Sequence, residues 1–340
     1  MDDPAAGDDP VPSPSTAGSD ALSVILPGDT VARYRKFSLY NSPYPAHDRG
    51  CAVDLYPESN VGVSPVAGVV RDTRTVRCPD RPYAVDHDHL VLVDVDVEAS
   101  GIRVGGGSEP EDGLVARILH VDPDAPNGVE PGDEVAVGDP LGEMVRSGFF
   151  GQWVDNHVHL GFRAPDRNPY RAAGSLPLAV DATVEPVTWD GTGTVVETGA
   201  THAVLDAPAH PAAGSSGTAA FAAIAADDGC ALDGGLAHYS AGGLLSGAGA
   251  VEEVEGVVAG DAGDPRPVSL LGHEVGVAHG RDVTWGDVAL SAGDQPLVGL
   301  SLFAGRDALG AKLVAFDHGF AVGDEVRVRI EPTDDPVRLD

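Results

Sequence analysis

Short valine-rich runs alternate with glycine, proline and aspartate turns from residue 23 onward, at a spacing of about ten residues, and this pattern constrains the fold most. The 44 glycines and 27 prolines interrupt the chain too often for long amphipathic helices. The sequence therefore predicts an all-β protein. The clearest predicted strands, antiparallel by their alternation and turns, cover residues 61–76, 89–99, 113–121, 133–145 and 156–164.

The chain length and the distribution of short apolar runs predict two β domains. A chain of 340 residues is too long for one ordinary hydrophobic core. Residues 1–22 contain almost no bulky apolar side chain and are expected to form a disordered acidic tail. A first domain is expected over 23–176, and a second, sandwich-like β domain over 177–340. Within the second, the Ala/Gly-rich segment 209–229 fits either a helix or a loop.

The net charge of −32 arises from 53 acidic and 21 basic residues, of which only Lys36 and Lys312 are lysines. Because the acids are spread along the whole chain, we interpret them as a surface adapted to high salt, where screening removes self-repulsion. A dedicated acidic interaction face is the alternative. No cluster of Lys and Arg is present to neutralise phosphates, so the sequence argues against nucleic acid as a partner.

Cysteine spacing and hydropathy bear on the compartment. Cys51, Cys78 and Cys230 are odd in number and lack CxxC spacing, which argues against a disulfide framework and a thiolate zinc site. The first residues show no basic and apolar leader, and no later run reaches 18 apolar residues. We therefore expect no membrane span and a cytoplasmic location.

The strongest local signal is the pair His157 and His159 in "DNHVHLGF". Alternate residues of a strand point to one face and lie about 6.5–7 Å apart, so both imidazoles can reach one site. An exposed polar strand face is the alternative interpretation of such a pair.

His47 and Asp54 in "PAHDRGCAVDLYP" offer two further ligand types. Catalytic zinc takes three protein ligands from His, Asp and Glu and leaves one position open. His47, Asp54 and His159 would supply such a set, and its nitrogen and oxygen donors suit Zn²⁺. Taken alone, His47 and Asp54 are more often parts of a turn.

Motif order adds a family resemblance over residues 44–165. The segments "GCAVDLYP", "SPVAGVVRD", "HLVLVDV", "ARILHVDP", "VEPGDEVAVGDPLGEMVRSG" and "NHVHLGFR" follow one another as in the family. In this order the chain resembles the lysostaphin-type (LytM-like) zinc metalloendopeptidases of the duplicated-hybrid-motif fold. The resemblance implies an antiparallel LytM-like domain, a zinc cofactor and a peptide or peptidoglycan-like substrate.

The resemblance also implies roles for individual residues. His47, Asp54 and His159 match the three zinc ligands, while His120 and His157 match two non-ligand catalytic histidines. A neutral histidine can take a proton from water, and a second can stabilise the oxyanion or protonate the leaving amine. The sequence does not assign these two tasks between His120 and His157.

The spacing of the first motif departs from the lysostaphin-type pattern. The usual spacing is His-x-x-x-Asp, whereas six residues separate His47 from Asp54. The segment "HDRGCAVDL" instead resembles the first motif of D-alanyl-D-alanine carboxypeptidases. A loop at "DRG" must therefore bring His47 back to Asp54 if the site is to form.

Three functions compete. The first is a zinc metalloendopeptidase whose C-terminal domain positions substrate. The second is a non-catalytic LytM-like module that binds or regulates a protein partner, with the C-terminal domain as a candidate contact surface. The third, a relative of the glucose-permease phosphocarriers, needs no Asp54 ligand and ranks last. The remaining candidates are assigned no functional role. His87 and His89 are interpreted as solvated turn residues, and Cys51 as a packing residue. The histidines without ligand spacing are His202, His210, His238, His273, His279 and His318.

Overall fold

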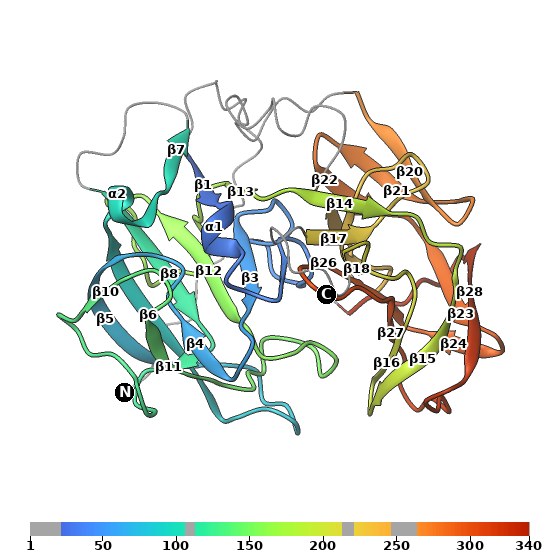
Figure 1. The fold of residues 1–340 in the computed structure, drawn as a ribbon, viewed down its shortest axis with the longest axis horizontal. Helices are drawn as coiled ribbons and strands as arrows, with labels where there is room; N and C mark the ends of the chain where they lie inside the picture. Colours follow the sequence, from blue (N-terminus) through green and yellow to red (C-terminus); the bar gives the residue numbers. More distant parts are fainter. Residues whose placement is uncertain (1–21, 106–112, 213–220, 246–263, 340) are drawn as a thin grey trace, which may run out of the picture.

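The computed structural model describes residues 22–105, 113–212, 221–245 and 264–339. Strands dominate these ranges, and the helices α1 (Gly28–Val31) and α2 (Val97–Ser100) have four residues each. The prediction of an all-β chain with two β domains is confirmed (Figure 1). The predicted disordered tail lies outside the described residues, apart from Leu22. The described helices are far too short and polar to cross a bilayer.

One sheet of ten strands organises the first domain and continues into the second half of the chain. Its neighbours are antiparallel except for the parallel pair β14–β17. In spatial order the strands are β10 (Glu134–Val135), β5 (Gly68–Arg77), β6 (His87–Val95), β8 (Leu114–Leu119), β12 (Val158–Arg163), β3 (Ala52–Tyr56), β2 (Lys36–Ser38), β26 (Ala304–Gly305), β17 (Phe221–Ile224) and β14 (Val184–Val187).

Two small sheets complete the first domain. In one, β1 pairs in parallel with β13 and antiparallel with β7, so residues just before β14 still pack with the start of the described chain. This sheet has the order β13 (Leu178–Asp181), β1 (Ser23–Pro27) and β7 (Arg103–Gly105). The other small sheet has the order β4 (Val61–Val63), β11 (Pro140–Met144) and β9 (Val121–Asp122).

The C-terminal part forms a curled antiparallel half-barrel of twelve strands (Figure 1). The curl encloses a second hydrophobic core, so one face is buried as in the expected sandwich. The order is β20 (Arg266–Leu270), β21 (His273–His279), β22 (Asp282–Trp285), β19 (Ala241–Leu244), β18 (Leu232–Leu236), β25 (Gly299–Leu302), β27 (Lys312–Val314), β16 (His202–Leu205), β15 (Thr192–Gly199), β28 (Glu325–Pro332), β23 (Val288–Ala292) and β24 (Gln295–Leu297).

Local chemistry ends some strands earlier than the hydrophobic pattern predicts. The run 89–99 leaves the sheet after Val95, because the Asp96 side chain accepts the Ala99 N–H and caps α2. The run 133–145 divides at Gly138, which has a φ of +95°. In the Ala/Gly-rich segment 209–229, the described part contains strand β17 and no helix.

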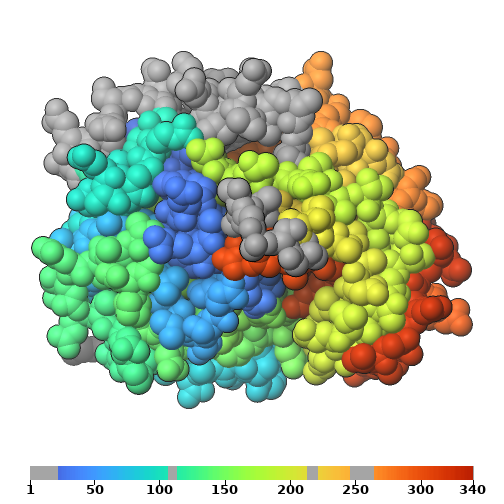
Figure 2. Space-filling view, in the orientation of Figure 1, coloured from blue at the N-terminus to red at the C-terminus, as the bar shows by residue number. Residues whose placement is uncertain are grey.

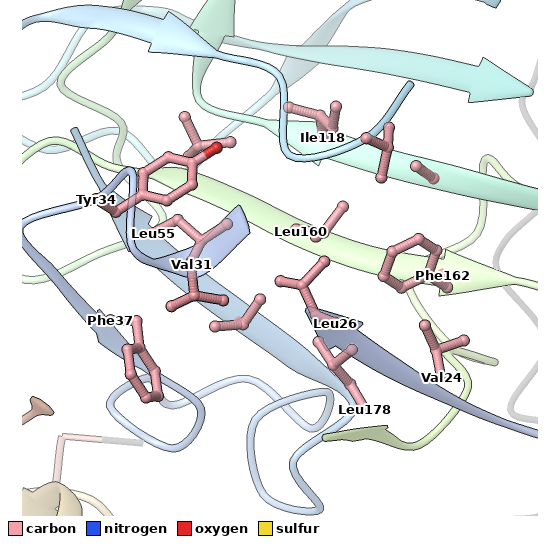
Figure 3. Close-up of a cluster of buried hydrophobic side chains, with 14 of the residues drawn as sticks. Val24, Leu26, Val31, Tyr34, Phe37, Leu55, Ile118, Leu160, Phe162 and Leu178 are labelled. Carbon is pink, nitrogen blue, oxygen red and sulfur yellow. The ribbon is translucent and has the colours of Figure 1, made fainter. Parts of the chain in front are cut away.

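Successive side chains of β12 point alternately to the hydrophobic core and to the face that carries the candidate site. Val158, Leu160 and Phe162 are buried in the first hydrophobic core, where they pack with residues such as Leu55 (Figure 3). Burying side chains of this size stabilises the fold by roughly 1.5–3 kcal/mol each. His159 consequently points to the opposite face of the sheet, as does His157 just before the strand.

The two halves of the chain share backbone pairing. β2 pairs with β26, with Phe37 opposite Ala304, and Phe37 makes an edge contact with Phe221 at a centroid distance of 4.9 Å. In the space-filling view, the blue segment near residue 37 adjoins an orange-red segment of the second half (Figure 2). The second half therefore packs directly beside the strands that carry the candidate site.

Candidate metal centre

Adjacent strands place Asp54 beside His159. β3 and β12 are antiparallel, and Asp54 lies directly opposite His159 in their register. Val53 and Leu55 occupy the core side of β3, so Asp54 faces the other side with His159. The result is a distance of 2.9 Å between Asp54 Oδ1 and His159 Nδ1.

A folded loop brings His47 to the same place. The His47 N–H donates to the Tyr44 carbonyl at 2.8 Å, and the Cys51 N–H donates to the Ala46 carbonyl at 2.7 Å. Gly50 completes the loop with a φ of +54°, a conformation that glycine adopts without steric cost. The loop thereby absorbs the three additional residues between His47 and Asp54.

The three candidate ligand atoms form a compact triangle. His47 Nε2 lies 3.1 Å from His159 Nδ1 and 3.4 Å from Asp54 Oδ1. A tetrahedral zinc ion with bonds of about 2.0–2.1 Å separates its ligand atoms by about 3.3 Å, which is close to these two distances and longer than the 2.9 Å between Asp54 Oδ1 and His159 Nδ1. His47 and Asp54 are buried, whereas the His159 side chain is 15% exposed and gives the centre an edge toward solvent. His47, Asp54 and His159 therefore form a group that can hold a metal ion.

Burial and charge set the protonation of this group. Burial lowers the pKa of His157 to about 4 and that of His159 to about 3. Burial alone would raise the pKa of Asp54, but His157 and His47 outweigh it and hold this pKa well below its usual value. Burial also lowers the pKa of His47, but the Asp54 charge outweighs that effect and the net shift is upward. The lowered pKa values keep His157 and His159 neutral beside the Asp54 carboxylate, whereas the raised pKa of His47 favours the imidazolium, whose proton a bound divalent cation would displace.

His120 and His157 flank the triangle. Their ring centroids lie 4.9 Å apart, and the His120 ring lies 5.7 Å from that of His159. His157 Nδ1 lies 2.9 Å from the Asp155 carbonyl, which can only accept, so this nitrogen carries the proton. The unprotonated His157 Nε2 then lies on the Asp54 side, 3.5 Å from Oδ2. The structure thus gathers all five residues singled out in the sequence.

Sequence reasoning missed Asp88, which orients His120. This buried carboxylate accepts from His120 Nδ1 at 2.6 Å and from Ser147 Oγ at 2.5 Å. Burial would raise the pKa of Asp88, but His120 and the hydrogen bonds outweigh it and lower the pKa to about 2. Alternation in "HDH" could have shown that Asp88 points inward when its neighbours point outward. His87 and His89 are themselves strand residues of β6, which corrects their interpretation as turn residues.

Other candidates stay outside the metal group. The three cysteines are free thiols, and the half-buried Cys51 makes a weak contact with its neighbouring Arg49 carbonyl. Within the described ranges, the only cluster of potential ligands with suitable spacing is His47, Asp54 and His159, so no histidine of the second half belongs to one.

An aromatic cleft of about 570 Å³ adjoins the centre. Phe149 and Phe150 line the cleft and also contact His120, with centroid distances of 6.2 and 5.2 Å. Both halves of the chain contribute to it. Among the described residues, its aromatic lining consists of Tyr44, Tyr83, Phe149, Phe150, Trp153, Tyr239 and Phe316, and Arg81 is the one charged residue in the lining.

Comparison with known families separates the same two parts. The N-terminal domain of DUF8155, a domain of unknown function, matches residues 25–180, and the C-terminal domain of DUF8155 matches residues 185–331. The chain is a two-domain DUF8155 protein. The five site residues of this DUF8155 protein all lie within its N-terminal domain. No curated protein and no solved structure matches the DUF8155 chain.

Proposed function

We propose that this protein is a zinc-dependent metallopeptidase that hydrolyses an amide bond. The observation that carries the proposal is the convergence of His47, Asp54 and His159, whose ligand atoms lie within 4.8 Å of one another, with two further histidines beside them. A structural zinc site normally has four protein ligands, whereas three ligands and an edge toward solvent are typical of a catalytic site. The motif order of the lysostaphin-type endopeptidases supports the same reaction.

The flanking histidines suit opposite proton transfers. Zinc bound at the three ligands would lower the pKa of water to about 7 and polarise the substrate carbonyl. His157, whose pKa is held near 4 by burial, is neutral and can accept a proton at Nε2. His120 donates Nδ1–H to Asp88, and this carboxylate stabilises the imidazolium, so His120 can protonate the leaving amine.

The aromatic cleft provides a place for the substrate. It lies beside His120 through Phe149 and Phe150, and Tyr239 and Phe316 extend it from the second half of the chain. The exposed Phe316 adds apolar surface to this cleft, which a bound ligand would cover. A peptide in this cleft would contact both domains.

Burial of the centre favours one alternative, a non-catalytic module that uses its ion to hold a binding surface. His47, Asp54 and His157 are each nearly inaccessible to solvent. In such a module the ion would be retained without turnover, and the aromatic cleft would bind a protein partner.

Zinc content tests the metal, and cleavage tests the reaction. Elemental analysis should give about one zinc per chain, lost in His159→Ala and retained in His273→Ala, whose exposed side chain lies in β21. A wild-type protein that takes up no zinc would overturn the proposal. His157→Ala should retain zinc. It should cleave glycine-rich or proteome-derived peptides at least ~100-fold more slowly than the wild type. Zinc binding by the wild type without cleavage would favour the non-catalytic module.

A further inference from the structure

The second half of the chain contacts the backbone segments that orient two histidines of the centre. We propose that Asp233 and Lys312 are positioning residues, Asp233 for His47 and Lys312 for His157. This inference rests on the proposed function, because it gives the C-terminal domain a part in building the metal centre. Each contact runs through one backbone carbonyl of the first domain.

The path to His47 begins at Asp233 in β18, whose side chain is 0% exposed. Its Oδ2 accepts the Leu39 N–H at 2.6 Å and the Tyr40 N–H at 3.2 Å, while Oδ1 accepts from Ser38 Oγ at 2.6 Å. The Leu39 carbonyl in turn accepts Nδ1–H of His47 at 2.8 Å. Asp233 therefore fixes the backbone at Leu39. Because Nδ1–H of His47 bonds to the Leu39 carbonyl, Nε2 of His47 is available for the ion.

The path to His157 begins at Lys312 in β27. Lys312 Nζ lies 3.2 Å from Asp155 Oδ1, and Lys36 Nζ lies 2.6 Å from Oδ2 of the same carboxylate. These are the only two lysines in the sequence, and both are buried. The Asp155 backbone carbonyl accepts Nδ1–H of His157 at 2.9 Å. Asp155 orients the His157 ring, and Lys312 links Asp155 to the second domain.

An acceptor on Nδ1 decides both the tautomer and the rotation of an imidazole. Partners of this kind affect metal affinity or activity by about 10–100-fold in metalloproteins. The carbonyls themselves belong to Leu39 and Asp155, which lie outside the strands and are contacted by the side chains of Asp233 and Lys312. Removing Asp233 takes away the acceptor of two backbone N–H groups, and removing Lys312 leaves Asp155 with Lys36 and Arg35 of the first domain alone; neither change alters a residue that touches the ion.

Cobalt binding and peptide cleavage test the two paths in the full-length protein. With Co²⁺ as the probe, Asp233→Asn should bind about 10–100-fold more weakly and change the visible spectrum, since His47 is a ligand. Lys312→Met should keep Co²⁺ affinity but lower kcat, and Lys312→Arg should restore it. The matched controls Asp324→Asn and Arg329→Met, at exposed positions of the same domain, should behave as wild type.

Histidine tautomers give a readout that does not depend on metal or activity. In ¹⁵N-histidine spectra of the metal-free protein at pH 7.5, the Nδ1–H form of His47 should be lost in Asp233→Asn, and that of His157 in Lys312→Met. Wild-type tautomers in both variants would overturn the inference. If wild type binds no Co²⁺, the proposed function fails while the tautomers still decide this inference. If Asp233→Asn does not fold, Ser38→Ala, which removes one Asp233 contact, replaces it and should shift the His47 signals.

Discussion

Asp88 and His120 form a buried pair in which Asp88 Oδ2 lies 2.6 Å from His120 Nδ1. They come from neighbouring strands, since β6 pairs with β8 and His120 directly follows β8. His120 has a φ of +71°, an uncommon backbone conformation for a residue other than glycine. The carboxylate and the neighbouring backbone together fix the imidazole beside the metal group.

Asp88→Asn should slow peptide cleavage by about 100-fold or more while leaving zinc content unchanged. An amide oxygen can still accept from Nδ1–H, but it does not stabilise the imidazolium that His120 must form as an acid. Steady-state rates and elemental analysis of the same sample measure both quantities. The exposed Asp86→Asn serves as the control. An unchanged rate in Asp88→Asn would remove His120 from the proposed proton transfer.

Asp233 should make the stability of the metal-free protein depend on pH between about 4 and 7. Burial raises the pKa of Asp233 from 3.8 to about 7, against the opposing hydrogen bonds of Ser38 and the backbone. Within this interval the folded chain keeps a proton that the unfolded chain has released, so the stability contribution is full at low pH and is lost as pH rises. In thermal unfolding with a chelator, the difference between wild type and Asp233→Asn should shrink from pH 4 to 7 and level off above. Parallel curves would contradict this assignment.

Gly50→Ala should weaken both the fold and the metal site. At a φ of +54° a side chain is strained by about 1–2 kcal/mol, and the new Cβ would lie 2.8 Å from Tyr40 Oη and 2.7 Å from Arg281 Nη2. Because this loop carries His47, zinc affinity should fall along with the unfolding temperature. Gly229→Ala is the control, since Gly229 has a φ of +88° with no atom within 4 Å of the added Cβ. Equal zinc affinity in Gly50→Ala and wild type would contradict the role of the loop.

The part of the site that sequence could predict depends on local rules. Strand alternation correctly placed His157 and His159 on one face, and hydrophobic runs located the strands that carry Asp54 and His159. The link between Leu39 and Asp233 spans 194 residues and depends on how the half-barrel packs against β2. No local pattern specifies such a contact. The LytM-like assignment and the zinc chemistry stay predictions, because they rest on motif order and on side-chain geometry alone.

The two buried lysines are a second feature that the sequence could not predict, in this case an arrangement of charges. The composition shows only two lysines, and the spread of acidic residues is interpreted as a property of the surface. The structure places Lys36 and Lys312 in the interior on the Asp155 carboxylate, with Arg35 at 3.0 Å from it. The pairing could not be predicted, since it needs β2, β27 and the segment before β12 to meet. The acidic surface and the interior lysines are therefore separate features.

Salt should stabilise the folded protein strongly, if the acidic surface is an adaptation to salt. At a net charge of −32 the folded chain repels itself, and raising ionic strength toward 1 M shortens the Debye length to about 3 Å. Relief of about 3 kcal/mol of repulsion would raise the unfolding temperature by roughly 6–12 °C for domains of this size. Unfolding followed by circular dichroism from 0.1 to 3 M KCl measures the change. Most of the rise should occur below 1 M, where screening acts; a rise only at higher salt would point to salting-out, and no rise would contradict the adaptation.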